Sequence, residues 1–364
     1  MKITLQRSAF IERLQHVTKA VASKITLPIL EGVLIESAGG LTLTCSDTHL
    51  TIKTTLEDYE EVDAGKAVIP AKKLLEVIRK MPEKQISIDV TGSKALIKCG
   101  STKVELPALE QDEFPEKHFP AEAMASIDGD QFAKLIDNTK FAVSSNEATP
   151  VLQGIQILQE HGKITAIATD RHRLAKQSIS LGTDVGAEGD SQHVAPVKAL
   201  EAVVQLKQDA VELSFSDNNI YLRAGAYQYI GALPSGSYPD TSRIIPTSAN
   251  ITALINTKQL LQTIELAEKI VEEKTKIVRL EVSDGEVHVS ARDGAAGMEE
   301  SLGAEVIGEE IKLSLNAKYL IDAVKCISTE RTELLFTGAL APVIVRAEGN
   351  ESGLHLVLPY RTTG

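Results

Sequence analysis

The chain has 364 residues, of which 43% are hydrophobic, 24% charged and 4% aromatic, and its formal net charge is −12. The composition is ordinary for a globular protein. The chain is too long to fold around one hydrophobic core, so we expect two or three domains. The absence of an apolar leader after Met1 and of any long apolar run predicts a cytoplasmic protein. Three cysteines far apart in the chain, Cys45, Cys99 and Cys326, predict buried thiols and not a disulfide framework or a zinc site.

The sequence is a threefold repeat. Residues 28–35, Pro-Ile-Leu-Glu-Gly-Val-Leu-Ile, return at 150–157 as Pro-Val-Leu-Gln-Gly-Ile-Gln-Ile. An alternating strand follows at 41–47 in the first copy and at 164–170 in the second, and a weaker third copy has its strand at 287–293. Each copy then has a second half that starts with a short strand and another helix. The repeat therefore predicts three domains, with bounds 1–120, 121–248 and 249–364.

The start of the second helix in each repeat is marked in the sequence. Pro70 and Pro196 stand where a helix begins, because a missing amide hydrogen costs nothing in the first turn. Asn316 is the third counterpart. Many alternating strands with two helices per domain predict an α+β fold of antiparallel sheets. The six expected helices cover residues 6–24, 71–84, 129–146, 196–208, 257–276 and 316–331.

The expected helices are basic although the whole chain is acidic. Over the six ranges, 20 Lys and Arg stand against 12 Asp and Glu, an excess of +8 that leaves −20 for the remainder. Helix propensity explains lysines on any single helix, but Glu is as good a helix former, so propensity predicts no sign bias across six. The segregation favours a helical surface that contacts the phosphates of a polyanion without stacking on bases.

The most charged motif is Thr-Asp-Arg-His-Arg-Leu-Ala at 169–175. Taken alone, it suggests that His172 is a general base. The first repeat has Asp-Thr-His at 47–49 and the third has Asp-Gly-Ala at 293–295, so the shared Asp is expected to bond backbone amides in a turn. The sequence contains no phosphate-binding loop, zinc-protease motif or nucleophile elbow. We therefore predict a protein that is not an enzyme and uses no cofactor or metal.

The chain resembles the bacterial sliding clamp, the beta subunit of DNA polymerase III, over essentially its whole length. The resemblance is carried, in order, by residues 27–30, 169–175, 238–246, 316–320 and 358–361. It implies a head-to-tail homodimer that closes a ring of six domains, with helices around a hole for duplex DNA. Such a processivity factor tethers the replicative polymerase, and the clamp loader and repair proteins bind it through short peptide motifs.

Carried over residue by residue, the resemblance implies three sets of functional residues. A groove for partner peptides would consist of Leu152, Thr169, Arg171, His172, Arg173, Leu174, Pro239, Arg243, Ile244, Leu356, Leu358, Pro359, Tyr360 and Arg361. Residues facing DNA would be Lys24, Lys72, Lys73, Arg79, Asn146, Lys198 and Lys318. The dimer contact would place Ile270 and Val271 against Ser101, Lys103 and Val104 of the other subunit. Arg171 departs from the family pattern, because a small residue is common there, and it adds charge to the groove.

An alternative belongs to another class of function. The chain could be a monomeric repeat protein that binds DNA or peptides, for example a clamp paralogue that does not serve the main replicase. Sedimentation distinguishes the two, because a ring requires a dimer.

Overall fold

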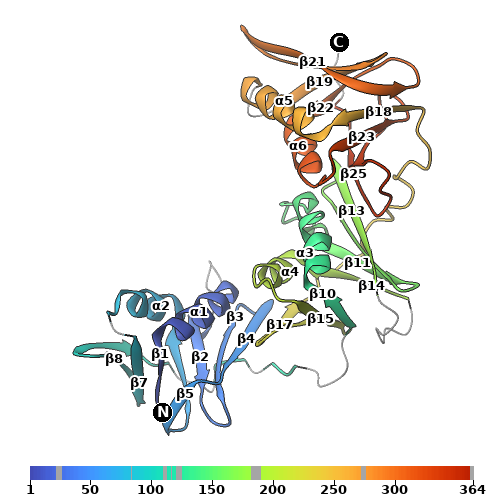
Figure 1. Cartoon of the computed structure of the whole chain (residues 1–364). Helices are drawn as coiled ribbons and strands as arrows, with labels where there is room; N and C mark the ends of the chain where they lie inside the picture. Colours follow the sequence, from blue (N-terminus) through green and yellow to red (C-terminus); the bar gives the residue numbers. More distant parts are fainter. Residues whose placement is uncertain are drawn as a thin grey trace. The chain divides into compact units, whose positions relative to one another are not determined.

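The computed structural model describes residues 1–21, 27–82, 84–109, 113–115, 117–119, 125–181, 190–271 and 276–360. These residues form two compact units, whose elements are labelled in Figure 1. The first unit contains Met1–Phe132 and Lys198–Leu233. The second contains Ala133–Asp184, Glu188–Val197 and Pro234–Gly364.

Six α-helices begin within one residue of the predicted starts. Their bounds are α1 Arg7–Val17, α2 Ala71–Lys80, α3 Gly129–Asp137, α4 Val197–Val204, α5 Thr257–Ile270 and α6 Ala317–Lys325. Each ends several residues before the predicted end, because the apolar periodicity continues into turns that are not α-helical. After α1, for example, the chain continues as a 3-10 turn at Thr18–Ala20, and Pro82 follows the end of α2.

The strands that the structure describes form three antiparallel sheets. In spatial order, the five-stranded sheet consists of β5 (Tyr59–Asp63), β1 (Lys2–Gln6), β7 (Gln85–Thr91), β8 (Lys94–Cys99) and β9 (Thr102–Pro107). The eight-stranded sheet consists, in the same sense, of β10 (Ala125–Asp128), β15 (Ala210–Phe215), β16 (Asn219–Ala224), β17 (Tyr227–Ala232), β4 (Leu50–Leu56), β3 (Leu41–Ser46), β2 (Gly32–Glu36) and β6 (Lys66–Pro70). The twelve-stranded sheet consists of β14 (Ser191–Pro196), β11 (Gly154–Glu160), β12 (Lys163–Thr169), β13 (Arg173–Ser180), β25 (Gly353–Val357), β24 (Val343–Ala347), β23 (Arg331–Phe336), β18 (Ile251–Asn256), β21 (Ala296–Ile307), β20 (Glu286–Asp293), β19 (Ile277–Ser283) and β22 (Ile311–Asn316). The predicted α+β class is confirmed.

The core of each unit lies between the helices and one face of its sheets. In the second unit α5 and α6 pack side by side (Figure 1). Their buried faces meet alternate residues of the strands. Val287 and Val289 of β20 are fully buried with Leu260 and Ile264 of α5. None of the helices among the described residues is long and apolar enough to cross a membrane. The three cysteines are free thiols; Cys45 and Cys99 are buried as predicted, and Cys326 is half-buried.

Consecutive repeats are joined by strand pairing. β17, the last strand of the middle repeat, pairs with β4 of the first repeat. β25, the last strand of the third repeat, pairs with β13 of the middle repeat. The middle repeat is therefore divided between the two units, since its halves pair with different neighbours. The boundaries after residues 120 and 248 stay predictions.

Candidate functional site

The turn between β12 and β13 is held by Asp170. Its Oδ1 accepts hydrogen bonds from the backbone N–H groups of His172 and Arg173, at 2.9 and 3.0 Å. Thr169 Oγ1 donates to the carbonyl of Arg173 at 2.7 Å and accepts from the N–H of Arg171 at 3.2 Å. Arg171 has a φ of +75°, in the left-handed region. The predicted Asp turn is confirmed.

The first repeat forms the same turn without the same side chains. Asp47 Oδ1 accepts from the N–H groups of His49 and Leu50, at 3.1 and 2.7 Å, and Thr48 has a φ of +76°. The shared Asp is therefore a scaffold residue. What distinguishes the middle repeat is the set of side chains that its turn presents.

Among the described residues, His172 has no partner that supports acid–base chemistry. Its ring lies against the ring of Tyr319 on α6, with the centroids 6.3 Å apart. Within the described part of the chain no hydrogen bond reaches either ring nitrogen, so no carboxylate orients the imidazole as general-base catalysis requires. The geometry gives no support to an active site at His172.

Arg173 links the middle repeat to helix α6. Its Nε lies 3.0 Å from Asp170 Oδ2, and its Nη1 lies 2.6 Å from Asp322 Oδ2. The guanidinium carbon is 4.5 Å from the ring centre of Tyr319 and 5.3 Å from that of Phe141. With 10% of its side chain exposed, Arg173 is occupied by its own chain. It positions the turn, and its charge is already paired within the chain, so little of it is left to contact the partner peptide for which the family resemblance predicts it.

An apolar cluster lies on the other face of β13. Leu174 of β13 pairs with Leu356 of β25, and both are buried together with Leu152. The Tyr238 hydroxyl donates to the carbonyl of Ile167 at 3.3 Å, which ties the segment after β17 to the same cluster. The structure thus brings together three of the predicted apolar groove residues from separate elements.

Three exposed apolar side chains lie close in the chain to members of this cluster. Ile244, Leu358 and Tyr360 are 49%, 41% and 51% exposed, although burial of such side chains is favourable. The Leu358 N–H donates to the carbonyl of His172 at 2.9 Å, so Leu358 lies beside the turn. We call the buried cluster and its exposed border the docking surface, with members Leu152, Leu174, Ile244, Leu356, Leu358 and Tyr360. Of the other predicted groove residues, Pro239 is exposed, Pro359 is half-buried and Arg361 lies outside the described residues.

A second feature is a pair of free strand edges. β9 is the last strand of the five-stranded sheet, and its outer edge has no partner among the described strands. The 296–303 part of β21 pairs with β20 on one side only, because β18 pairs with β21 from Ala304 onward. Seven of these eight residues are exposed or half-exposed. An unpaired edge of this length is a template for another strand.

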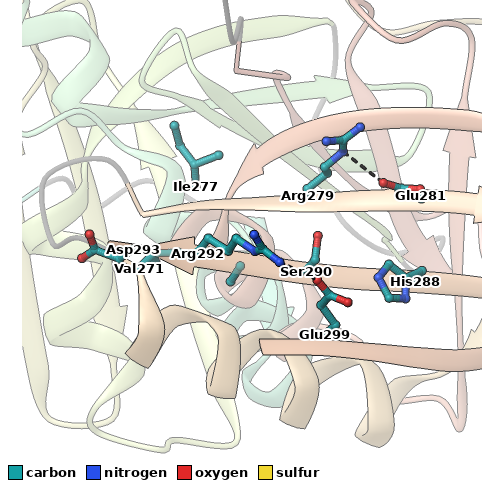
Figure 2. Close-up of a pocket in the computed structure, with 10 residues that line it drawn as sticks. Val271, Ile277, Arg279, Glu281, His288, Ser290, Arg292, Asp293 and Glu299 are labelled. Atoms are coloured by element: carbon teal, nitrogen blue, oxygen red, sulfur yellow. Dashed lines mark hydrogen bonds and ion pairs between the residues drawn. The ribbon is translucent and has the colours of Figure 1, made fainter. Parts of the chain in front are cut away.

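The face of β19, β20 and β21 that points away from α5 is charged. Arg279, Glu281, Arg292 and Glu299 line a hollow of about 700 Å³ on this face, together with His288 (Figure 2). Arg279 pairs with Glu281 at 3.1 Å, and Arg292 pairs with Glu299 at 3.4 Å. The free edge of β21 is thus bordered by charged side chains of both signs.

The chain matches three family models, described as the N-terminal, central and C-terminal domains of the DNA polymerase III beta subunit, at residues 1–118, 126–240 and 242–361. The chain belongs to this family. It is 30% identical to the beta sliding clamp of Bacillus subtilis and 31% identical to that of Halalkalibacterium halodurans, each over the whole of both chains. The crystal structure of the Bacillus subtilis DNA polymerase sliding clamp covers 100% of this chain and 99% of its own, with a TM-score of 0.95 and 30% identity. A sliding clamp structure from Pseudomonas aeruginosa has a TM-score of 0.92 at 26% identity and full coverage of both chains. The fold is the three-domain clamp fold of this family.

The residues that the family resemblance placed on DNA lie on exposed surfaces. Lys72, Lys73 and Arg79 are exposed on α2, Lys318 is exposed on α6, and Asn146 is exposed in the loop before Pro150. The charge excess of the helices is concentrated on α2, which carries four basic residues and one acidic residue. The other helices are close to balanced, because several of the basic residues counted in the sequence lie beyond the observed helix ends. Lys24 lies outside the described residues.

Other predicted functional residues are engaged with neighbours. Lys198 at the start of α4 forms an ion pair of 2.5 Å with Asp47, the turn residue of the first repeat, and keeps half of its side chain exposed. Ile270 and Val271 at the end of α5 pack partly against the core of the second unit. On the other predicted side of the dimer contact, Ser101 and Lys103 are exposed or half-exposed and Val104 is half-buried.

Sequence reasoning missed two groups of residues. Asp322 and Phe141, which hold Arg173, were not predicted, and nothing in their local sequence marks them as its partners. Glu299 and Arg292, beside the free edge of β21, were also missed. The repeat holds a partial signal for these: β17 and β25 are each used at an internal junction, so among the described strands no last strand of a following repeat covers the 296–303 part of β21.

Proposed function

We propose that the chain is a sliding clamp, a processivity factor of which two copies encircle duplex DNA and tether the replicative polymerase during replication and repair. It acts in the cytoplasm as a non-catalytic subunit of the polymerase assembly. The observation that supports this most directly is the pattern of strand pairing between repeats. Among the described strands, two repeat junctions are made within the chain. One last strand and one strand that follows an Asp turn keep a free edge, which a second copy can pair.

The repeat pattern supplies the pairing rule. At both internal junctions a last strand covers the strand that follows the Asp turn: β17 covers β4, and β25 covers β13. The counterparts left over are β9, a last strand, and the 296–303 part of β21, which follows the turn of the third repeat. In a head-to-tail dimer, β9 of each copy pairs with β21 of the other. Two such interfaces form, and they close the assembly.

The register of the pairing follows from the same symmetry. At the internal junctions, the residue four positions after the turn Asp is paired across: Thr51 with Ile230, and Leu174 with Leu356. The corresponding residue of the third repeat is Gly297. In all three repeats this residue also pairs, within its own hairpin, with the residue just before the Asp.

The partner residue on β9 is found from the hairpin that precedes it. Ile230 is the third residue after Tyr227, which faces the last residue of β16. Thr102 has the equivalent place in β9, facing Cys99. The third residue after Thr102 is Glu105, so the symmetry places Glu105 of one copy opposite Gly297 of the other.

Side-chain chemistry agrees with this register. It sets Val104 opposite Met298 on the helix-covered face, where Met298 packs against the core. It sets Lys103 opposite Glu299 on the outer face, where opposite charges in directly facing positions stabilise a sheet by about 0.2–1 kcal/mol. A slip of one residue would put charged side chains on the apolar face.

Glu105 also finds a complementary charge. Gly297 carries no side chain, and its neighbour on the far side is Arg292 of β20. Arg292 is 80% exposed and lies on the outer face with Glu299 (Figure 2). Arg292 of one copy and Glu105 of the other would thus flank Gly297 about 10 Å apart at the backbone, a span that both side chains can bridge.

The DNA contact proposed for this clamp is made by helical lysines and arginines. The main contacts are proposed for Lys72, Lys73 and Arg79 on α2, and further contacts for Lys198 and Lys318. They are exposed, and no exposed aromatic side chain is present on α2 to stack on a base. Contacts of this kind hold phosphates independently of sequence and weaken with salt. A closed ring keeps DNA by topology, so such weak contacts do not prevent sliding.

Polymerase, clamp loader and repair proteins would bind the docking surface through short peptides. Buried Leu152, Leu174 and Leu356 give a rigid base, and exposed Leu358 and Tyr360 offer apolar area that a peptide can cover. Apolar side chains that anchor in such a surface dominate the affinity of peptide motifs. Replacing Leu358 and Tyr360 by Ala should abolish polymerase binding and leave dimerisation unchanged.

A charge exchange tests the ring. Lys103→Glu puts like charges together at both interfaces of a two-copy ring, and so does Glu299→Lys. Each should cost about 1–4 kcal/mol in total over the two interfaces, which raises the dimer Kd roughly 5- to 700-fold in sedimentation velocity. The double variant should recover most of the affinity. Lys163→Glu, an exposed lysine of β12 away from both edges, is the control.

Failure of the double variant to recover would refute the register, and a monomer mass for the unmodified chain at micromolar concentration would refute the ring. The second outcome favours the monomeric paralogue. Topological holding is tested separately, with nicked circular and linear DNA of equal length. A loaded clamp should stay on the circle and run off the linear ends, whereas equal retention on both would count against encirclement.

A further inference from the structure

The basic side chains near the docking surface differ in how far carboxylates of the same chain neutralise them. Arg171 is exposed, and its side chain makes no ion pair with any residue that the structure describes. Arg243, 86% exposed, is paired at 3.1 Å with Asp240, which is itself exposed. The Arg173 charge, in contrast, is fully occupied by two carboxylates.

Lys176 is a second free cation on the same face. In a strand alternate residues share a face, so Lys176 lies on the same side of β13 as Leu174. Its neighbours across the sheet are Ile167 and Leu354, both apolar, and among the described residues no carboxylate pairs with it. Leu174 is therefore bordered by Lys176 along the strand and by the turn of Arg171 at its start.

The position of Arg171 is one where the backbone favours glycine. The third repeat has Gly294 there, with a φ of +55°, while the first has Thr48 at +76°. A long side chain in the left-handed region is uncommon and costs conformational energy. Backbone hydrogen bonds to Thr169 and Asp170 hold the turn, but the Arg171 side chain adds no contact of its own within the described structure.

We propose that the peptides which dock here carry an acidic side chain next to their apolar anchors, and that Arg171 and Lys176 recognise it. This rests on the docking role proposed above. The guanidinium of Arg171 offers a planar pair of donors for a carboxylate. The preference runs against the net charge of −12, which repels an acidic peptide at long range. It must therefore arise locally.

Two fluorescent peptides test the inference. They share the same leucine and phenylalanine anchors and differ only in two flanking residues, Asp in one and Asn in the other. Anisotropy with the full-length chain at low salt should give a Kd roughly five- to tenfold lower for the Asp peptide, as for a charge-assisted contact. The advantage should shrink at high salt, because exposed charges are screened.

Variants locate the effect. Arg171→Gly, which suits the left-handed turn, should bring the ratio of the two Kd values close to one, and Lys176→Gln should lower it part of the way. Lys163→Gln, on the neighbouring strand but outside the docking surface, should leave the ratio unchanged. Equal affinity of the unmodified chain for both peptides would overturn the inference while leaving the docking role intact, and so would an Asp preference that persists in Arg171→Gly with Lys176→Gln. Binding of neither peptide would overturn the docking role and this inference with it.

Discussion

Removal of Arg173 should strongly destabilise the second unit. Its guanidinium is 10% exposed and joins Asp170 on the turn to Asp322 on α6, at 3.0 and 2.6 Å. Arg173→Ala leaves two carboxylates without their cation, and breaking a buried pair in this way costs about 3–5 kcal/mol. We expect the lower end, about 3 kcal/mol, because the Asp322 side chain keeps 26% of its surface in solvent and can recover part of its hydration.

Arg173→Lys separates charge from shape. A lysine keeps the positive charge but cannot bond both carboxylates through a planar fork or lie flat against the rings of Tyr319 and Phe141. We expect a loss of about 1–2 kcal/mol for this variant. In a double-mutant cycle, Asp322→Asn should cost much less in the Arg173→Ala background than alone, since the two side chains interact directly.

The assay is urea unfolding of the full chain, with hydrogen exchange of the β13 and α6 amides as the local measurement. The local readout is needed because a chain of two units need not unfold in one step. Arg223→Ala is the control: its pair with Glu212 spans 2.8 Å, but the side chains are 38% and 40% exposed, so less than about 1 kcal/mol should be lost. A loss for Arg173→Ala no greater than for this control would refute the reasoning.

Two further predictions concern packing and pH. A Cβ on Gly154 would lie 2.6 Å from Cγ1 of Val194, so Gly154→Ala should cost about 1–3 kcal/mol in urea unfolding. Gly338→Ala is the control and should be nearly neutral, because no atom lies within 4 Å of the added carbon. Equal losses for the two variants would contradict the packing argument. Burial lowers the pKa of His355 to about 4, so the folded state favours the neutral ring. The contribution of His355 to stability is therefore full above the unfolded pKa near 6.5. It falls by about 3 kcal/mol in all as the pH drops toward 4. His355→Leu should remove this part of the slope between pH 7 and pH 4 and leave the part due to His16, whose pKa burial also lowers to about 4; an unchanged slope would show that His355 does not contribute.

Interactions between residues close in the chain could be predicted from the sequence. The turn at Asp170 is one, because a carboxylate that bonds the amides two and three residues later needs only local backbone. The six helix starts are another: Asn256 and Asn316 cap α5 and α6 through amides three residues on. The ends of the helices were placed too late, since apolar spacing continues past the last α-helical turn.

The docking surface was predicted in part. The family resemblance assigned Leu174, Leu358 and Arg173 to one peptide groove, and this role stays a prediction. Leu358 lies beside the turn that precedes Leu174, whereas the charge of Arg173 is paired within the chain. Its occupation by Asp322 depends on the packing of α6 against β13, between residues separated by 149 positions. No local pattern encodes a contact of that range, because many carboxylates in this acidic chain could have been its partner.

The motif at 169–175 first suggested catalysis, and the repeat alone was enough to identify its Asp as scaffold. By itself, then, the sequence determined the threefold repeat, the helix and hairpin starts and the family. Tertiary structure decided which strand edges are covered and which stay free, because antiparallel pairing joins backbone groups regardless of side chain and over any chain distance. Only with β4 and β13 already covered does the uncovered edge of β21, opposite β9 of a second copy, become the place where the proposed ring closes.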